Sequence, residues 1–518
     1  MKDSEGNVYV SGGAKNRYSY FLIKYNANGV QQWYRTYDGT RPTCIAAGLA
    51  VDMDDNIIIS GEWGSGANGD DIVTIKYKPN GDTIWTRHFD DSRYPSSEWG
   101  RDMLLDDSGN IYIAGLSLFA YDSINTANIG VLVKLDSSGN KIWERYIEED
   151  SIEISSIDLW QIEIDGSGYI YVGGSRQING DQDILVAKYS PSGNQEWITI
   201  HDGKISNAFS GMFTNPTGES FIVGANSAGN KYLTLKYNSS GNLSWYNTYT
   251  PSEGSEASGL SIIANDSGNI FITGFTKEYE IWTPTSRLSL TTIKYNSVGS
   301  QMWVSSYIYQ NAYSGYSKGR SIAIDDQSNV FVQGYRYNDG TSHSSDRLLL
   351  KYSNTDGSII AENVYDAGGD DGRGDWLDPI LVDDSNNIYI SFESEQCSTC
   401  FNFDVVTMKY NQDDDKLSTL KFQNLPIQYN LSQNYPNPFN PVTQINYSIK
   451  NNEKVKIFIY SILGGVVKTL VDEYQTSGYK SVVWDGTNDN GYNVSSGLYI
   501  YKLVAGNYTN TKKMILIK

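Results

Sequence analysis

The stretch Asp106-Asp-Ser-Gly-Asn-Ile-Tyr-Ile-Ala-Gly115 decides the fold, because copies of it recur along most of the chain. An Asp side chain accepts hydrogen bonds from backbone N–H groups just after it, and Gly readily takes a positive φ, so Asp-x-x-Gly predicts a tight turn. The Ile and Tyr residues that follow favour a β-strand. Further copies occupy residues 3–12, 52–61, 165–174, 265–274, 325–334 and 383–392, and a degraded one occupies 215–224.

A second pattern follows each copy: three apolar residues and then, in its fullest form, Lys-Tyr-x-x-x-Gly-x-x-x-Trp. Its lysines are Lys24, Lys76, Lys134, Lys188, Lys236, Lys294, Lys351 and Lys409. Their spacing ranges from 48 residues (188 to 236) to 58 residues (76 to 134). Nine residues after the first six lysines stand Trp33, Trp85, Trp143, Trp197, Trp245 and Trp303. In the last two units Ala361 and Ser418 take the tryptophan's place.

Each repeat divides into four short strands, which in the second unit are expected at 46–51, 56–60, 72–77 and 83–87. Short strands with Gly and Asp turns at a period of about 50 residues are typical of the blades of a β-propeller. The sequence therefore predicts an all-β chain with a propeller over residues 1–425, its tryptophans packed between adjacent blades. Eight units are visible, the first without its first strand. We expect eight blades; seven would form if residues 380–382 completed the first unit.

This repeat resembles the bacterial β-propeller repeat family called SBBP. The resemblance rests on motifs such as residues 106–115 followed by Val131-Leu-Val-Lys134, and it covers residues 1–415. It implies a propeller fold and an exported protein, but no particular ligand.

The composition of the chain limits the binding partners and the cellular compartment that can be expected. The net charge of −20 repels phosphate backbones, so we expect no nucleic-acid partner. The sequence holds no transmembrane segment. Residues 1–7 lack the apolar core of a signal peptide, so we expect a fragment, or a mis-assigned start, of a longer exported protein. Cys397 and Cys400 suit a small loop disulfide in an oxidising compartment better than a zinc or redox site.

The texture changes near the C-terminus, where Leu431-Ser-Gln-Asn-Tyr-Pro-Asn-Pro-Phe-Asn-Pro441 opens a series of alternating strands with Gly and Asn turns. This pattern predicts a small Ig-like β-sandwich over residues 426–518. The segment also resembles the type A sorting domain of type IX secretion cargo, in its opening, in Trp484-Asp-Gly486, in Ser496-Gly-Leu-Tyr499 and in Lys513-Met-Ile-Leu-Ile-Lys518. Gly464-Gly465 departs from the family, which tends to have Gly and then a basic residue.

The resemblance to sorting domains implies a route of secretion and a binding partner. The type IX secretion machinery would recognise residues 426–518 and carry the chain across the outer membrane. The segment would then be cleaved or would anchor the protein, so the expected location is extracellular or on the outer cell surface. The alternative is an ordinary Ig-like module.

No catalytic constellation stands out. His88, His201 and His343 are scattered, and the common nucleophile, metalloprotease and phosphate-binding motifs are missing. The Asp turns lack the alternating carboxylates and bidentate Glu of a calcium loop, so we expect no cofactor, with Ca²⁺ as the alternative. We accordingly expect a protein that is not an enzyme.

Binding residues often lie on variable connections between strands that a rigid scaffold holds in place. Trp63, Tyr121 and Trp282 fall on connections between the second and third strands of their units. Trp99 and Trp376 fall seven residues before the turn Asp, at the start of a first strand. We expect these five aromatic residues to bind a glycan or a surface protein, unless each packs only its own loop.

Two other functions stay open. The first is an enzyme that acts on extracellular polysaccharide with carboxylates from the same connections, such as Glu62, Asp70, Glu98 and Asp375. The second is a structural surface protein without a specific ligand.

Overall fold

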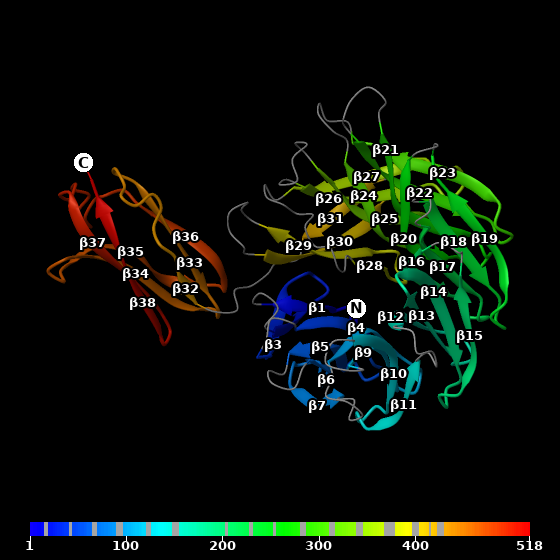
Figure 1. Ribbon diagram of the computed structural model, residues 1–518. Helices are drawn as coiled ribbons and strands as arrows, with labels where there is room; N and C mark the ends of the chain where they lie inside the picture. Colours follow the sequence, from blue (N-terminus) through cyan, green and yellow to red (C-terminus); the bar gives the residue numbers. More distant parts are fainter. Residues whose placement is uncertain are drawn as a thin grey trace. The chain divides into compact units, whose positions relative to one another are not determined.

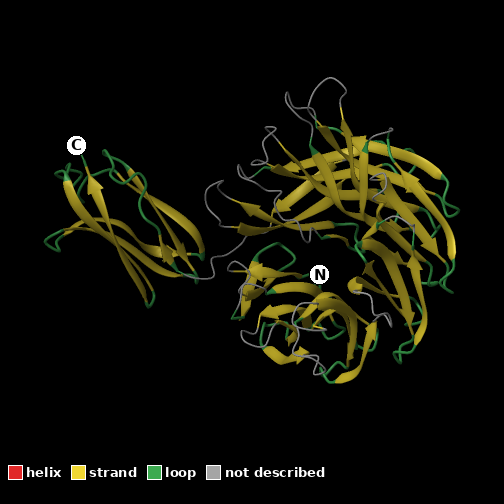
Figure 2. Ribbon diagram, in the orientation of Figure 1, coloured by secondary structure: helices red, strands yellow, loops and turns green. Residues whose placement is uncertain are grey.

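The chain folds into two compact units, Met1–Phe422 and Gln423–Lys518. The computed structural model describes residues 1–14, 19–40, 44–64, 70–89, 97–120, 126–147, 155–202, 206–226, 231–251, 255–279, 286–309, 316–337, 345–366, 379–395, 403–413, 416–421 and 429–517. All regular structure in these ranges is β, which confirms the all-β prediction (Figure 2). None of them contains a helix long and apolar enough to cross a membrane.

The N-terminal unit consists of antiparallel sheets whose strands follow one another in chain order (Figure 1). Sheet 1 has three strands, β1 (Val8–Ala14), β2 (Ser19–Tyr25) and β3 (Gln31–Asp38). Sheet 2 consists of β4 (Ile45–Val51), β5 (Ile57–Gly64), β6 (Asp70–Tyr77) and β7 (Thr83–Phe89). Sheet 3 consists of β8 (Glu98–Leu105), β9 (Ile111–Ala120), β10 (Thr126–Leu135) and β11 (Lys141–Ile147). Sheet 4 consists of β12 (Ser155–Ile164), β13 (Ile170–Ile178), β14 (Asp181–Tyr189) and β15 (Gln195–His201).

Sheets 5 to 8 repeat the same order. Sheet 5 consists of β16 (Asn207–Thr214), β17 (Ser220–Asn226), β18 (Lys231–Tyr237) and β19 (Leu243–Tyr249). Sheet 6 consists of β20 (Glu256–Ala264), β21 (Ile270–Tyr279), β22 (Ser286–Tyr295) and β23 (Gln301–Tyr307), and sheet 7 of β24 (Ser317–Ile324), β25 (Val330–Tyr337), β26 (Ser345–Tyr352) and β27 (Ile359–Tyr365). Sheet 8 consists of β28 (Ile380–Val382), β29 (Ile388–Glu395), β30 (Phe403–Asp413) and β31 (Lys416–Lys421).

The repeated Asp closes the turn between the first two strands of a sheet. In sheet 3 the Asp106 carboxylate accepts hydrogen bonds from the backbone N–H groups of Ser108 (3.0 Å) and Asn110 (2.9 Å). It also accepts bonds from the Asn110 side chain (2.8 Å) and the Tyr112 hydroxyl (3.2 Å). Gly109 has φ 76°, a conformation that costs glycine little. The Asp, Gly, Asn and Tyr of the repeat thus form one turn device.

The repeated tryptophan fastens each sheet to the next one. The Trp143 indole N–H donates to the Pro191 carbonyl at 3.2 Å, and Lys134 Nζ donates to the same oxygen at 3.1 Å. The Trp143 ring lies against Gly193 of the same turn in sheet 4. We call this arrangement the indole clasp. Equivalent bonds join Trp33 to Pro79, Trp197 to Ser239, Trp245 to Ser297 and Trp303 to Asn354.

The indole clasp confirms the prediction that these tryptophans pack between adjacent sheets. Two details could not be predicted from the spacing of the repeat. Trp85 lies against Gly139 of sheet 3, but its indole N–H has no hydrogen-bond partner in the described structure. In sheet 8 the residue opposite Lys409 is Leu420, not Ser418, which pairs with Asn411. The count of nine fails there because β30 continues to Asp413, past the point where the equivalent strands end.

Hydrophobic clusters join consecutive sheets throughout the unit. One contains Leu132 of sheet 3 with Leu159 of sheet 4, and another contains Leu290 of sheet 6 with Leu348 of sheet 7. The last sheet shares such a cluster with the first, because Tyr389 of β29 is buried with the residues of β1 and β2. Lys2 Nζ also lies 2.9 Å from Asp383 Oδ2, at the turn before β29.

The first strand of six sheets carries a β-bulge at one fixed position, five residues before the turn Asp or Asn. A bulge leaves one residue without a partner on the neighbouring strand. In sheet 3, Gly100 pairs with Gly115 and Asp102 pairs with Ala114, so Arg101 is the bulged residue. The bulged residues of sheets 2 to 7 are Ala47, Arg101, Trp160, Ser210, Leu260 and Arg320.

The bulge explains the glycine that ends the repeated motif. A Cβ on Gly224 would lie 1.9 Å from the carbonyl oxygen of Ala208, two residues before the bulged Ser210. The equivalent distances at Gly61, Gly115, Gly174, Gly274 and Gly334 lie between 2.0 and 2.2 Å. In sheet 8 the first strand is only Ile380–Val382, its pairing shows no bulge, and Phe392 replaces the glycine.

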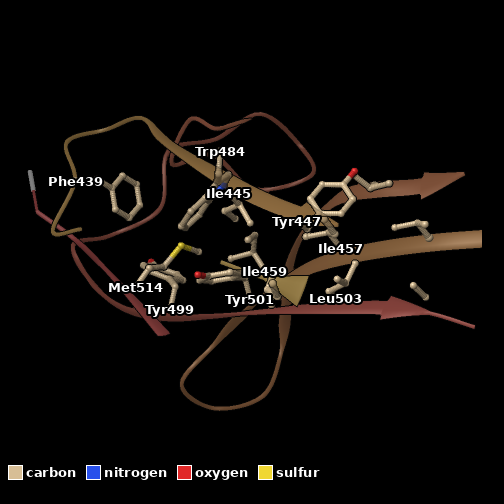
Figure 3. Packing of buried hydrophobic residues seen from close by; sticks show 14 of the residues in the cluster. Phe439, Ile445, Tyr447, Ile457, Ile459, Trp484, Tyr499, Tyr501, Leu503 and Met514 are labelled. Carbon is tan, nitrogen blue, oxygen red and sulfur yellow. The ribbon is translucent and has the colours of Figure 1, made fainter. Parts of the chain in front are cut away.

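The C-terminal unit is a sandwich of two antiparallel sheets. Its strands are β32 (Asn430–Leu431), β33 (Thr443–Ile449), β34 (Glu453–Ser461), β35 (Val466–Gln475), β36 (Gly478–Trp484), β37 (Gly497–Ala505) and β38 (Tyr508–Leu516). One sheet has the order β32-β33-β36 and the other β35-β34-β37-β38. Figure 3 shows Ile445 and Trp484 from the first facing Ile459 and Tyr501 from the second.

The motif residues of this unit hold its opening segment against its last strand. The backbone N–H of Phe439 donates to Ile515 O at 3.0 Å, and that of Ile517 donates to Phe439 O at 2.9 Å. The Tyr501 hydroxyl accepts from the Asn434 N–H at 2.9 Å and donates to Ser432 O at 2.7 Å. Residues far apart in the segment therefore stabilise one another.

Candidate functional site

Aromatic and acidic side chains gather where β3, β5 and β7 end and where β6 and β8 begin. We call the set formed by Tyr37, Trp63, Asp70, Asp71, His88 and Trp99 the rim cluster. Trp63 pairs with Asp71 across β5 and β6, and Gly64 pairs with Asp70. Neighbouring residues of a strand point to opposite faces, so Asp71 and Asp70 serve the two faces of sheet 2.

On the face toward sheet 1, three side chains form a hydrogen-bonded chain. His88 Nδ1 lies 3.3 Å from Asp71 Oδ2, and His88 Nε2 lies 3.2 Å from the Tyr37 hydroxyl. A carboxylate at Nδ1 favours the tautomer with its proton there, which leaves Nε2 to accept from tyrosine. Burial, first, and then the nearby Cys44 and Asp71 raise the pKa of Tyr37, so its hydroxyl keeps its proton and acts as the donor.

Trp63 lies beside this chain. Its ring makes an edge contact with His88, at 4.9 Å between ring centroids, and a tilted contact with Tyr37 at 6.0 Å. The indole N–H donates to Asp38 O at 3.3 Å. One side of the ring packs on the core shared by sheets 1 and 2, while the side chain stays partly accessible. The ring is thus fixed in place and still open to solvent.

On the opposite face, Asp70 holds Trp99. The Trp99 indole N–H donates to Asp70 Oδ2 at 3.3 Å, and the Asp70 backbone N–H donates to Ser97 Oγ at 3.2 Å. Trp99 is partly exposed, whereas Asp70 is only 7 % exposed. The carboxylate therefore positions the indole.

The structure describes two of the five aromatic residues that the sequence selected. Trp63 lies within β5 rather than on a connection, because this strand extends further than the repeat indicates, and Trp99 lies at the start of β8, where it was expected. Tyr121, Trp282 and Trp376 lie outside the described residues, as does Asp375. Tyr37, Asp71 and His88 were not anticipated as site residues, since nothing in sequence spacing relates β3 to β6 and β7.

The carboxylates considered for catalysis are buried. Glu62, Asp70 and Glu98 are 8 %, 7 % and 0 % exposed. Glu98 accepts a hydrogen bond from Ser117 Oγ at 3.3 Å. These groups support the strands around the rim cluster and have little surface to offer a substrate.

A second group of charged and aromatic side chains lies on the bulged first strands. The Arg101 guanidinium carbon is 4.7 Å from the ring centroid of Trp160, its counterpart in sheet 4. Burial lowers the pKa of Arg101, and the charges of Glu62 and Asp158 act in the opposite direction. Asp158 in turn accepts from Asn128 Nδ2 at 2.7 Å. The constant distance to the turn Asp is the only sequence signal that could have linked Arg101 with Trp160.

Two further carboxyl groups on these strands resist ionisation. Burial raises the pKa of Asp102 to about 7, although the N–H groups of Ile162 and Met103 donate to it. Burial and the neighbouring Asp102 raise the pKa of Glu163 to about 8, against a hydrogen bond from Gln161. A carboxyl whose pKa is higher in the folded state stabilises the fold when protonated, and this contribution is lost as pH rises through the folded-state pKa.

We expect the Glu163→Gln variant to flatten this dependence. Its free energy of unfolding should match the wild type near pH 4 and exceed it by about 1–2 kcal/mol at pH 9, after allowance for water near the group. Urea unfolding of the full chain between pH 4 and pH 9 measures the difference. A parallel decline in both proteins would show that Glu163 does not cause it.

The turn carboxylates are already engaged by protein groups. Burial raises the pKa of Asp383, but hydrogen bonds from Lys2 and Asn387 lower it more strongly, to about 2. In the described ranges, His, Cys, Asp and Glu side chains form no group of three or more that could hold a metal ion. Cys44 is buried and forms no disulfide, while Cys397 and Cys400 fall outside those ranges.

Solved structures with some likeness to the chain were found at low identity. PorZ, a surface component of the type IX secretion system of Porphyromonas gingivalis, is 11% identical with a TM-score of 0.31, covering 100% of this chain and 82% of its own. An ulvan lyase with bound sugar is 13% identical with a TM-score of 0.41, covering 70% and 90%. A periplasmic gluconolactonase of Pseudomonas aeruginosa is 9% identical with a TM-score of 0.40, covering 82% and 98%.

Sequence comparisons bear on the C-terminal unit alone. A search of curated proteins found no match. Residues 443–508 match the family model described as the FlgD Ig-like domain, and this range includes most of the two-sheet sandwich. The match confirms the prediction of an Ig-like domain in this part of the chain.

Proposed function

We propose that the chain is an exported binding protein without catalytic activity, built from an eight-bladed propeller and a type IX sorting domain. The propeller presents the rim cluster to a glycan or surface protein, and residues 426–518 direct export to the cell surface. The rim cluster carries the binding role, because hydrogen bonds hold its aromatic rings while Trp63, His88 and Trp99 keep accessible surface.

Closure into eight blades is supported by the contacts between the last and first sheets. The cluster around Tyr389 and the Lys2–Asp383 ion pair join them, as similar clusters join all consecutive sheets. The seven-bladed alternative requires β28 to complete the first unit. β28 instead pairs with β29, which favours eight.

Export is supported by the way in which the sorting motifs depend on one another. The opening segment, the Trp484 strand and the last strand share one core. Removal of residues 426–518 should therefore leave the propeller in the periplasm of a bacterium that has type IX secretion, when both versions carry a secretion leader. Surface labelling of cells measures the outcome, and a strain without that secretion system is the control. Equal surface display of the shortened chain would refute the sorting role.

Binding at the rim cluster predicts a selective loss in point variants. We expect His88→Ala and Trp99→Ala to weaken binding of the full chain to its glycan or protein partner by about tenfold, the usual effect of removing an interface aromatic. Both side chains are at least partly exposed, so the melting temperature should change little. An array of glycans and outer-surface proteins serves as the assay.

The control for this experiment is Tyr246→Ala, which removes a 59 % exposed aromatic from sheet 5. Unchanged binding in the rim variants would place the ligand elsewhere. If the folded wild type binds nothing on the array, a structural surface role takes the place of the binding role. The carboxylate enzyme is not proposed, because Glu62, Asp70 and Glu98 are buried.

A further inference from the structure

The six bulged residues vary in chemistry although the structure around them is constant. Each stands five residues before its turn residue, and the residue just before each one pairs with a glycine on the second strand. The bulge and the glycine repeat, whereas the side chain changes from Ala to Arg, Trp, Ser, Leu and Arg. A variable side chain on a constant scaffold is where specificity is placed. Bulges commonly re-aim a side chain next to a functional site.

The bulged residues of neighbouring sheets share one region of the molecule. The first strands of consecutive sheets contact one another from β4 through β24. All six bulged residues are partly accessible to solvent. Solvent therefore reaches the first strands, where neighbouring sheets contact one another, and the bulged side chains are accessible to it there.

Arg101 and Trp160 have the composition of a sugar subsite. Trp160 offers an indole ring, which stacks well on the apolar face of a pyranose. Arg101 is held over this ring, and its Nε has no hydrogen-bond partner in the described structure. A buried N–H without a partner is unfavourable, so a shift of the side chain that presents this N–H to a ligand hydroxyl would be favourable. The charges of Glu62 and Asp158 act on Arg101, and the partly accessible Asp158 carboxylate can accept hydrogen bonds from sugar hydroxyls.

The charges in this group decide which sugars it suits. One guanidinium stands beside two carboxylates, so the local net charge is negative. An anionic sugar, such as a uronate or a sulfated residue, would be repelled, while a neutral sugar meets donors and acceptors without an unpaired charge.

We propose that Arg101 of β8 and Trp160 of β12 form, with Asp158, a binding subsite for a neutral sugar residue on the first strands of sheets 3 and 4. This subsite rests on the proposed binding function and deepens it, since it names the chemistry of the ligand. It shares no residue with the rim cluster.

Binding of neutral hexasaccharides to the full chain tests the proposal. Cello-, xylo- and mannohexaose are the probes, alginate hexasaccharide is the anionic counterpart, and calorimetry is the measurement. We expect at least one neutral probe to bind and the alginate probe to bind at least about tenfold more weakly. Trp160→Ala and Arg101→Lys should each weaken the neutral probe by about tenfold. Trp160→Phe, which keeps a ring, should restore most of the affinity.

Matched variants separate this proposal from the rim cluster. Leu260→Ala changes a bulged residue of sheet 6 and should leave binding unchanged. If the neutral probe depends on Trp99 and not on Trp160 or Arg101, the subsite is wrong and the rim function stands. Preference for alginate, or no binding by any neutral probe to a folded chain, also overturns the subsite. Melting curves show whether each variant is folded.

Discussion

Replacement of Trp143 by Ala should lower the free energy of unfolding by about 3–5 kcal/mol, the usual cost of removing a buried aromatic side chain. Trp143 is only 9 % exposed, it makes an edge contact with Tyr112 and it bonds the Pro191 carbonyl. Its loss leaves a cavity between sheets 3 and 4 and frees one side of the turn at Gly193. Thermal and urea unfolding of the full chain measure the effect.

The neighbouring Ile142→Ala variant is the control, because Ile142 is 51 % exposed in the same strand. It should change stability by less than about 0.5 kcal/mol. Ligand affinity should be unaffected by Trp143→Ala as long as the chain is folded, since the clasp lies at a turn away from the rim cluster. Unaltered stability in Trp143→Ala would show that the clasp does not hold the sheets together.

Replacement of Gly224 by Ala should cost about 3 kcal/mol or more, although it adds a single methyl group. The new Cβ would stand 1.9 Å from the Ala208 carbonyl oxygen, a backbone atom that cannot turn aside as a side chain can. Either the bulge at Ser210 is lost or the strand pair separates. Both outcomes remove hydrogen bonds between β16 and β17, which hydrogen exchange would detect along with the fall in melting temperature.

Gly12→Ala supplies a matched comparison. Gly12 is the same residue of the repeat, but sheet 1 has no bulged strand beside it, and the nearest atoms are at the far end of the Phe21 ring. That ring can shift, so Gly12→Ala should be several-fold milder. Equal losses in the two variants would mean that the bulge is not the reason for the glycine.

The repeat made much of the fold predictable. The Asp-x-x-Gly turns, the four strands of a unit and the position of Trp143 between sheets all follow from local hydrogen bonding and spacing, which recur in each copy. The spacing of the repeat does not predict the structure where a copy departs from the pattern. In sheet 8 the third strand runs on to Asp413, so a fixed count selected Ser418 instead of Leu420.

The candidate site was less predictable, for physical reasons. A bulge adds one residue to a strand without changing the residue types of that strand, so Arg101 and Trp160 read as ordinary strand residues. The rim cluster joins strands of three sheets, and only the folded chain brings Tyr37 to His88. Trp63 and Trp99 stand out in the sequence as aromatic residues outside the repeat pattern, and the structure places both in the rim cluster. Whether they bind a ligand stays a prediction.

The indole clasp has a direction, since each tryptophan grips the sheet that follows it. Sheet 7 carries Ala361 at this position and sheet 8 carries Leu420, so the contacts of sheet 8 with sheet 7 and with sheet 1 both lack the tryptophan of the earlier junctions. Stability in a repeat array depends on each neighbouring interface, and the weakest interface opens first. Thermal unfolding should therefore begin at sheet 8, the sheet nearest in sequence to the Ig-like domain, while the sheets fastened by tryptophan remain intact.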